Sequence, residues 1–142
     1  MSVHSAIRAF LTTDVSVAAL VGERVYTTAL PENTINNDGA FPAIAMHQIS
    51  RVPTSSHSGD SGYTDYRFQF NIWAKSEDDV EAVAAALTTA LNCYRGAMPA
   101  IGDAQITVES AFLDSEDRDK DDPGDGREMW VARQDYLISV AS

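Results

Sequence analysis

The side chains of this sequence that could act as nucleophiles or general bases are few and scattered. Its three histidines, His4, His47 and His57, fall in a predicted helix, a predicted strand and a polar stretch, and no two of them have the spacing of a metal-binding pair. A catalytic histidine needs a positioned partner, and none is evident beside any of the three. We therefore interpret all three as surface or hydrogen-bonded histidines.

Serine and cysteine chemistry has no supporting pattern either. Serines gather between residues 54 and 62, but no G-x-S-x-G turn accompanies them, and no glycine-rich phosphate-binding motif is present. Cys93 is the only cysteine, so no disulfide can form within the chain, which fits a reducing cytosol. It has no evident general base and reads as a packed or half-exposed thiol. The sequence predicts a protein that is not an enzyme, with no catalytic residues and no cofactor.

An acidic segment, residues 114–126, offers the strongest chemical alternative. Three aspartates alternate from Asp117, and Glu128 stands at the twelfth position, as in a calcium-binding loop. The sixth position of that loop needs glycine, whereas this chain has Asp122, and no helix pattern precedes the segment. We therefore predict a solvated charged loop and no metal site.

The aromatic residues between 66 and 70 could stack on the bases of a single-stranded nucleic acid. The charge balance opposes that interpretation: ten basic residues face 21 acidic ones, and the net charge is −11. Such a surface does not adhere to DNA phosphates or to anionic lipid. Core packing is the better explanation of the aromatic stretch.

Hydrophobic spacing predicts the elements that carry these residues. Apolar residues at helical intervals predict an amphipathic helix over residues 3–13, and Asp14 can cap a second short helix that Gly22 ends. Short strands are expected at 24–27 and 42–50, the second beginning at a proline.

Two polar stretches flank that second strand. Residues 30–39 are rich in asparagine and are expected to form a loop. Residues 53–64 are rich in serine and glycine and lack large aliphatic side chains, which predicts a long, exposed and mobile loop.

The clearest strand signal lies at residues 65–75, where apolar and polar side chains alternate strictly. The residues predicted to face a core are Tyr66, Phe68, Phe70, Ile72 and Ala74. Ser76 can then cap a helix over 77–95 with an acidic first turn and an apolar stripe, closed by Arg95 and Gly96. Two more strands are expected at 104–113 and 128–140, and we expect the helix to cover the sheet while the polar loops at 53–64 and 114–126 contact partners.

These elements predict one α+β domain over residues 1–142, a mostly antiparallel sheet with helices packed on one face. The N-terminus lacks the basic and apolar regions of a signal peptide, and nowhere do 18 apolar residues follow one another. We therefore expect a soluble protein made in the cytoplasm, with no membrane partner.

The order of several short motifs resembles the phage tail-completion family, which includes tail terminators and tail-to-head joining proteins. The motifs are Ala19-Leu20-Val21-Gly22-Glu23-Arg24-Val25-Tyr26, Leu30-Pro31, Phe41-Pro42-Ala43-Ile44, Ser58-Gly59-Asp60 and Arg67-Phe68-Gln69-Phe70-Asn71-Ile72-Trp73-Ala74. They cover roughly residues 5–95, and no family motif is visible after Gly96.

The resemblance implies a structural virion protein of a long-tailed phage or prophage, located at the head–tail junction and assembled in the host cytoplasm. It implies a homohexameric ring whose partners are the tail-tube protein and the head connector, with the genome passing through unbound. Two alternatives remain: another component of the head–tail neck, or a small α+β ligand-binding or regulatory domain that could be dimeric. A hydrolase is disfavoured because no catalytic set can be assembled.

Overall fold

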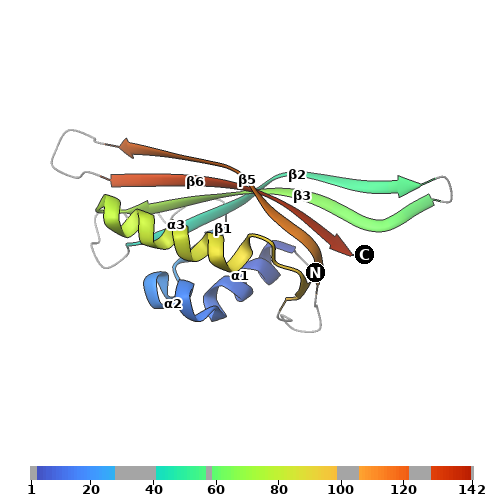
Figure 1. Ribbon diagram of the computed structural model, residues 1–142, viewed down its shortest axis with the longest axis horizontal. Helices are drawn as coiled ribbons and strands as arrows, with labels where there is room; N and C mark the ends of the chain where they lie inside the picture. The colour runs from blue at the N-terminus through green and yellow to red at the C-terminus, as the bar shows by residue number, and fades with distance from the viewer. Residues whose placement is uncertain (1–2, 28–40, 57–58, 99–105, 122–128, 142) are drawn as a thin grey trace.

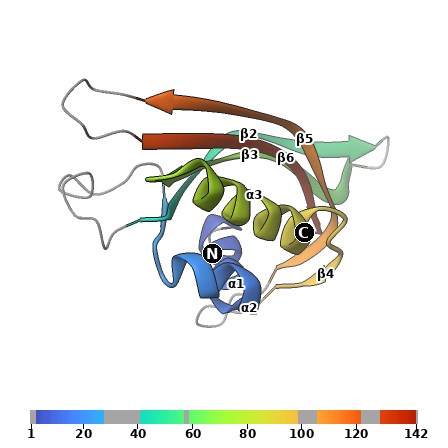
Figure 2. The same ribbon diagram turned by 60° about the vertical axis from the view of Figure 1, so that its left-hand side comes forward.

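The computed structural model describes residues 3–27, 41–56, 59–98, 106–121 and 129–141, and it has two layers. Three helices lie together on one face of a long, strongly curved sheet, and the other face carries no helix (Figures 1 and 2). The described chain forms a six-stranded sheet in the order β1-β2-β3-β6-β5-β4. All neighbouring strands are antiparallel except β1 and β2. The predicted α+β class is confirmed.

The two N-terminal helices are where the sequence predicts them. Helix α1 spans Val3–Thr13, and helix α2 spans Val15–Val21. The Asp14 carboxylate accepts a hydrogen bond from the backbone N–H of Val17, as expected of a capping residue. Gly22 ends α2 with a φ of 58°, a conformation that glycine adopts without strain.

The strands have the following bounds: β1 Val25–Thr27, β2 Ala43–Ser56, β3 Gly59–Ala74, β4 Gly96–Ala97, β5 Thr107–Asp121 and β6 Met129–Ala141. The five predicted core residues of β3 are buried against the helices, and all but Tyr66 are fully buried. Helix α3, Glu77–Leu91, covers this face with its predicted apolar stripe. The alternation of β3 and the spacing of α3 therefore predict the core correctly.

The predicted end of α3 was wrong. The helix stops at Leu91 instead of Arg95, and Asn92 is its C-terminal cap. The Asn92 side chain accepts a hydrogen bond from the backbone N–H of Leu113, and Cys93 takes a positive φ of 67°. These contacts turn the chain early, so Gly96 begins the short strand β4 instead of closing the helix.

The predicted mobile loop at 53–64 was also wrong. Strand β2 continues to Ser56 and β3 begins at Gly59, with Pro53 opposite Thr64 and Ser56 opposite Gly59. Main-chain pairing needs no large side chains, so a stretch rich in serine and glycine can still form a hairpin. Residues 57 and 58 lie outside the described residues, as does the loop predicted at 30–39.

The acidic loop predicted at 114–126 is a strand over its described part. Strand β5 runs through to Asp121, and its residues from Ser115 to Asp121 are paired along β6. A β-bulge lies between Leu113 and Ser115, so Asp114 is an extra residue in the ladder. Charged side chains occupy both faces of this strand, which is why periodicity did not reveal it. Residues 122–128 lie outside the described part of the chain.

A buried polar network joins α3 to β5 and β6. Gln134 is fully buried, and its amide nitrogen lies 3.1 Å from the Ala84 carbonyl oxygen, 3.0 Å from Thr88 Oγ1 and 2.6 Å from Glu116 Oε2. The Tyr136 hydroxyl donates to Gln134 Oε1 at 2.8 Å. Burial raises the pKa of Tyr136 to about 12; the Glu116 charge adds to the rise, and the Thr88 hydrogen bond opposes it.

We predict that Phe70→Ala and Leu87→Ala each lower the free energy of unfolding by about 2–5 kcal/mol, the usual cost of emptying a core site. Both side chains are fully buried. Thr89→Ala, at an exposed position of α3, is the control and should change stability by less than about 0.5 kcal/mol. Denaturation midpoints of both core variants equal to wild type would contradict this assignment of the sheet's inner face.

We predict that Tyr136 makes stability fall between about pH 10 and pH 12. In that window the folded protein keeps the phenol proton, because its pKa is raised to about 12, while the unfolded chain has lost it. The contribution is complete below the unfolded pKa of about 10, and two pKa units correspond to roughly 3 kcal/mol. Urea denaturation across this range should give a shallower decline for Tyr136→Phe. Parallel curves would show that the phenol does not titrate with unfolding.

Candidate assembly interface

The helix-free face of the sheet carries charged side chains linked across strands. Arg67 on β3 lies 3.0 Å from the Asp114 carboxylate on β5 and 3.5 Å from that of Asp135 on β6. Arg133 pairs with Asp117 at 3.0 Å. These pairs are half-exposed and contribute little to stability, so their main effect is to fix the pattern of charge on this face.

Exposed apolar residues lie beside these ion pairs. Phe112 and Leu137 are directly opposite each other on β5 and β6 and are 53% and 41% exposed. Val52, on the same face of β2, is 56% exposed. Side chains of this size, exposed together, are typical of a surface that another protein covers.

Two long hairpins end at opposite extremities of the molecule (Figures 1 and 2). On β2, residues 48–53 are all exposed, and on β5, residues 114–120 are all exposed. Because successive residues of a strand point to opposite faces, continuous exposure means that neither face of these segments is closely packed, although Glu116 and Arg118 reach Gln134 and Glu81 on the helix side of β5. The β2 segment contains one charged residue, Arg51, whereas the β5 segment is strongly acidic.

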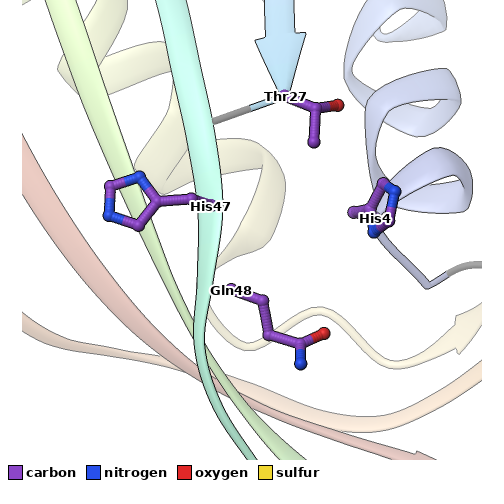
Figure 3. Close-up of a pocket in the computed structure, with 4 residues that line it drawn as sticks. All are labelled: His4, Thr27, His47 and Gln48. Carbon is purple, nitrogen blue, oxygen red and sulfur yellow. The ribbon is translucent and has the colours of Figure 1, made fainter. Parts of the chain in front are cut away.

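One cavity is lined in part by two of the predicted histidines, whose side chains do not point toward each other. It has a volume of about 500 Å³ and is lined by His4 of α1, Thr27 of β1, and His47 and Gln48 of β2 (Figure 3). His47 projects from the opposite side of β2 to Gln48, and its Nδ1 atom is buried without a hydrogen-bond partner among the described residues. These four lining residues include neither a carboxylate nor a thiol, so they do not form a catalytic set.

The other predicted candidates remain apart. Cys93 is exposed at the end of α3, and its backbone N–H donates to the Ala111 carbonyl oxygen at 2.7 Å. Asp117 and Asp119 lie in an extended strand, whereas a calcium loop must fold back around its ion. Within the described ranges, no three His, Cys, Asp or Glu side chains are placed to hold a metal ion. His57 and Glu128 lie outside those ranges.

Sequence reasoning missed the exposed strand segments because it assigned them to loops. The alternate spacing of Asp117, Asp119 and Asp121, which was compared with a calcium-binding loop, is also the spacing of residues on one face of a strand. None of the helices that the structure describes is long and apolar enough to cross a membrane.

Comparison with known proteins identifies a similar fold and a family. A chain from a structure titled "Virion of native gene transfer agent (GTA) particle" superposes with a TM-score of 0.73 and 16% identity, over 99% of this chain and 96% of that one. No curated protein matches the sequence. A family model described as "Tail completion protein gp17" matches residues 5–138. Because that match spans nearly the whole described fold, the chain belongs to the tail completion protein gp17 family.

Proposed function

We propose that this protein is a structural component of a phage or prophage tail that works as a tail terminator. In this proposal, a ring of identical subunits, a homohexamer, sits at the head-proximal end of the tail. One side of the ring binds the last ring of tail-tube protein and the other docks on the head connector. Family membership and the fold shared with a virion chain support this assignment.

The observation that carries the proposal is the pair of uncovered hairpin segments at opposite ends of one sheet. They are ordered by main-chain pairing, yet their residues are exposed, and the helix side of the β5 segment makes polar contacts through Glu116 and Arg118 without being closely packed. Subunits that join through two different surfaces make head-to-tail contacts, and such contacts close into a ring when the rotation between neighbours allows it.

The mechanism is geometric and requires no reactive group. In a closed ring, the lateral surfaces of every subunit are occupied by its two neighbours. The ring therefore presents one terminal surface to the tube, and no further tube subunit adds beyond it. That terminal surface stops growth, and the opposite surface remains available to the head connector. The same properties would suit another component of the head–tail neck, which differs only in the ring it contacts.

The charge of the assembly suits a conduit for DNA. Each subunit carries a net charge of −11, and a ring multiplies that charge. Phosphates near the wall are repelled over a screening length of about 8 Å at physiological salt. Binding would release no counterions, so the usual driving force for non-specific DNA affinity is missing.

A small-molecule binding domain is the second candidate, because of the cavity lined by His4 of α1, Thr27 of β1 and residues of β2. Mass in solution and in the presence of tail tubes separates the two functions. A ring of about six chains favours the terminator, whereas a dimer that binds a small ligand tightly favours the alternative.

We predict that deleting residues 55–61 leaves the fold intact and abolishes assembly at tube ends. The deletion removes the end of the β2–β3 hairpin and leaves residues 54, 62 and 63 to join Pro53 to Thr64, a loop of ordinary hairpin length. Thermal unfolding should stay close to wild type, while electron microscopy should show bare tube ends. A large loss of stability would mean that the segment is part of the fold and not an assembly surface.

We predict no measurable affinity for random-sequence duplex DNA at physiological salt, for the electrostatic reason given above. Fluorescence anisotropy with labelled duplex is the measurement. Asp117→Lys with Asp119→Lys is an informative comparison, because both side chains are exposed on β5 and the change adds positive charge there. Micromolar binding by wild type that weakens steeply with salt would overturn the passive-conduit role.

A further inference from the structure

One edge of the sheet lies along β2. Strand β1 pairs only with Ile44, Ala45 and Met46, and beyond them no described residue pairs with the outer edge of β2. Residues 48–53, which we call the β2 edge, are all exposed. Their outward N–H and C=O groups are a template for another strand.

The opposite edge lies along β5. Strand β4 pairs only with Thr107 and Val108, and the turn after α3 hydrogen-bonds Ala111 and Leu113. From Asp114 onward, no described residue pairs with the outer edge of β5. Residues 114–119, which we call the β5 edge, are all exposed.

The two edges have compatible directions. From β2 through β3 and β6 to β5, each strand is antiparallel to its neighbour, so β2 and β5 run in opposite directions. A copy placed beside the first in the same orientation therefore brings its β2 antiparallel to the β5 of the first. Antiparallel pairing is the more stable arrangement.

We propose that the subunits of the ring are joined by pairing the β5 edge of one copy with the β2 edge of the next. This inference rests on the ring of the proposed function and names its lateral contact. The sheet then continues from subunit to subunit, with all helices on one side and the charged face on the other.

Charge favours this joint over a twofold one. The β2 edge has Arg51 and no acidic residue, whereas the β5 edge has four acidic residues and Arg118. Pairing two β5 edges would place like charges opposite each other, which is destabilising. The acidic residues of the β5 edge and Pro53 on the β2 edge also discourage the addition of arbitrary strands. A strand with complementary charge is favoured instead.

Side-chain alternation supports a particular alignment. When Ser50 is placed opposite Asp117, both lie on the helix-free face, since Ser50 is opposite Arg67 and Asp117 is opposite Arg133 within one subunit. Neighbouring copies are then offset along the strands by about 15 Å across a sheet roughly 19 Å wide. That offset corresponds to a strand tilt of roughly 40°, within the range of closed barrels.

Cysteine cross-linking tests the joint in rings assembled at tail-tube ends. In a Cys93→Ser background, Ser50→Cys and Asp117→Cys subunits are assembled together and treated with a short bis-maleimide. We expect covalent dimers from the mixture and none from either variant alone. Ser50→Cys mixed with Thr89→Cys is the matched control, since Thr89 is exposed on α3 and lies away from both edges.

The outcomes separate this joint from the ring itself. Intact rings without cross-links would overturn the joint and leave the terminator role standing. Dimers of Asp117→Cys alone would show twofold pairing of β5 edges and also overturn the joint. Folded protein that never forms rings would overturn both proposals.

A charge reversal gives an independent readout. Arg51→Glu should raise the concentration needed for half-maximal ring assembly by roughly three- to tenfold, because an acidic residue then faces the acidic β5 edge. Arg95→Glu makes the same change in net charge at an exposed position off both edges and should have less than about a twofold effect. Equal effects of the two variants would contradict the joint.

Discussion

Twelve consecutive residue pairs join β3 to β6 without a bulge, from Tyr63 opposite Ala141 to Ala74 opposite Trp130. Every other part of the molecule is placed by this ladder. The helices pack on one of its faces, and β2 and β5 extend from its two sides. Because the central register is continuous, alternation sends mainly apolar side chains to the helices. The opposite face carries charged pairs such as Arg67 and Asp135 together with apolar residues such as Leu137 and Trp73.

Gln134 is a fully buried polar residue on the helix-covered face. Its amide group would be costly to bury alone, but α3 and β5 together supply its partners. The same contacts tie the distal part of β5 to the helix layer through Glu116. A buried polar network of this kind can specify how three elements meet, where apolar packing alone would allow sliding.

The sequence predicts the parts of this fold in which apolar side chains recur at the spacing of a buried helix or strand face. Helix α1 and the core face of β3 were predicted because burial imposes their spacing. The cap at Asp14 was predicted because its carboxylate can accept a free backbone N–H of the first helical turn. The outer strands were predicted only in part: their distal ends, beyond residues 50 and 113, were assigned to loops. Segments exposed on both faces need no hydrophobic alternation, because their backbone partners hold them. For the same reason, the exposed edges that we infer to join subunits had the composition of loops. The end of α3 depended on the distant contact between Asn92 and Leu113, which no local pattern contains.

The bulge at Asp114 affects how this protein family can vary in length. Without that extra residue, Asp117 and Asp119 would turn toward α3, and Glu116 and Arg118 would turn away. The bulge lies at the core end of the hairpin. It therefore sets which side chains of β5 point to each face of the sheet before the chain reaches the tip. Residues gained or lost at the tip would change the reach of the hairpin by about 3.3 Å each without inverting a face. Relatives could thus match partners of different dimensions by changing the tip of the hairpin alone. A single deletion on the core side of the hairpin would instead exchange the faces to which all the following side chains of β5 point.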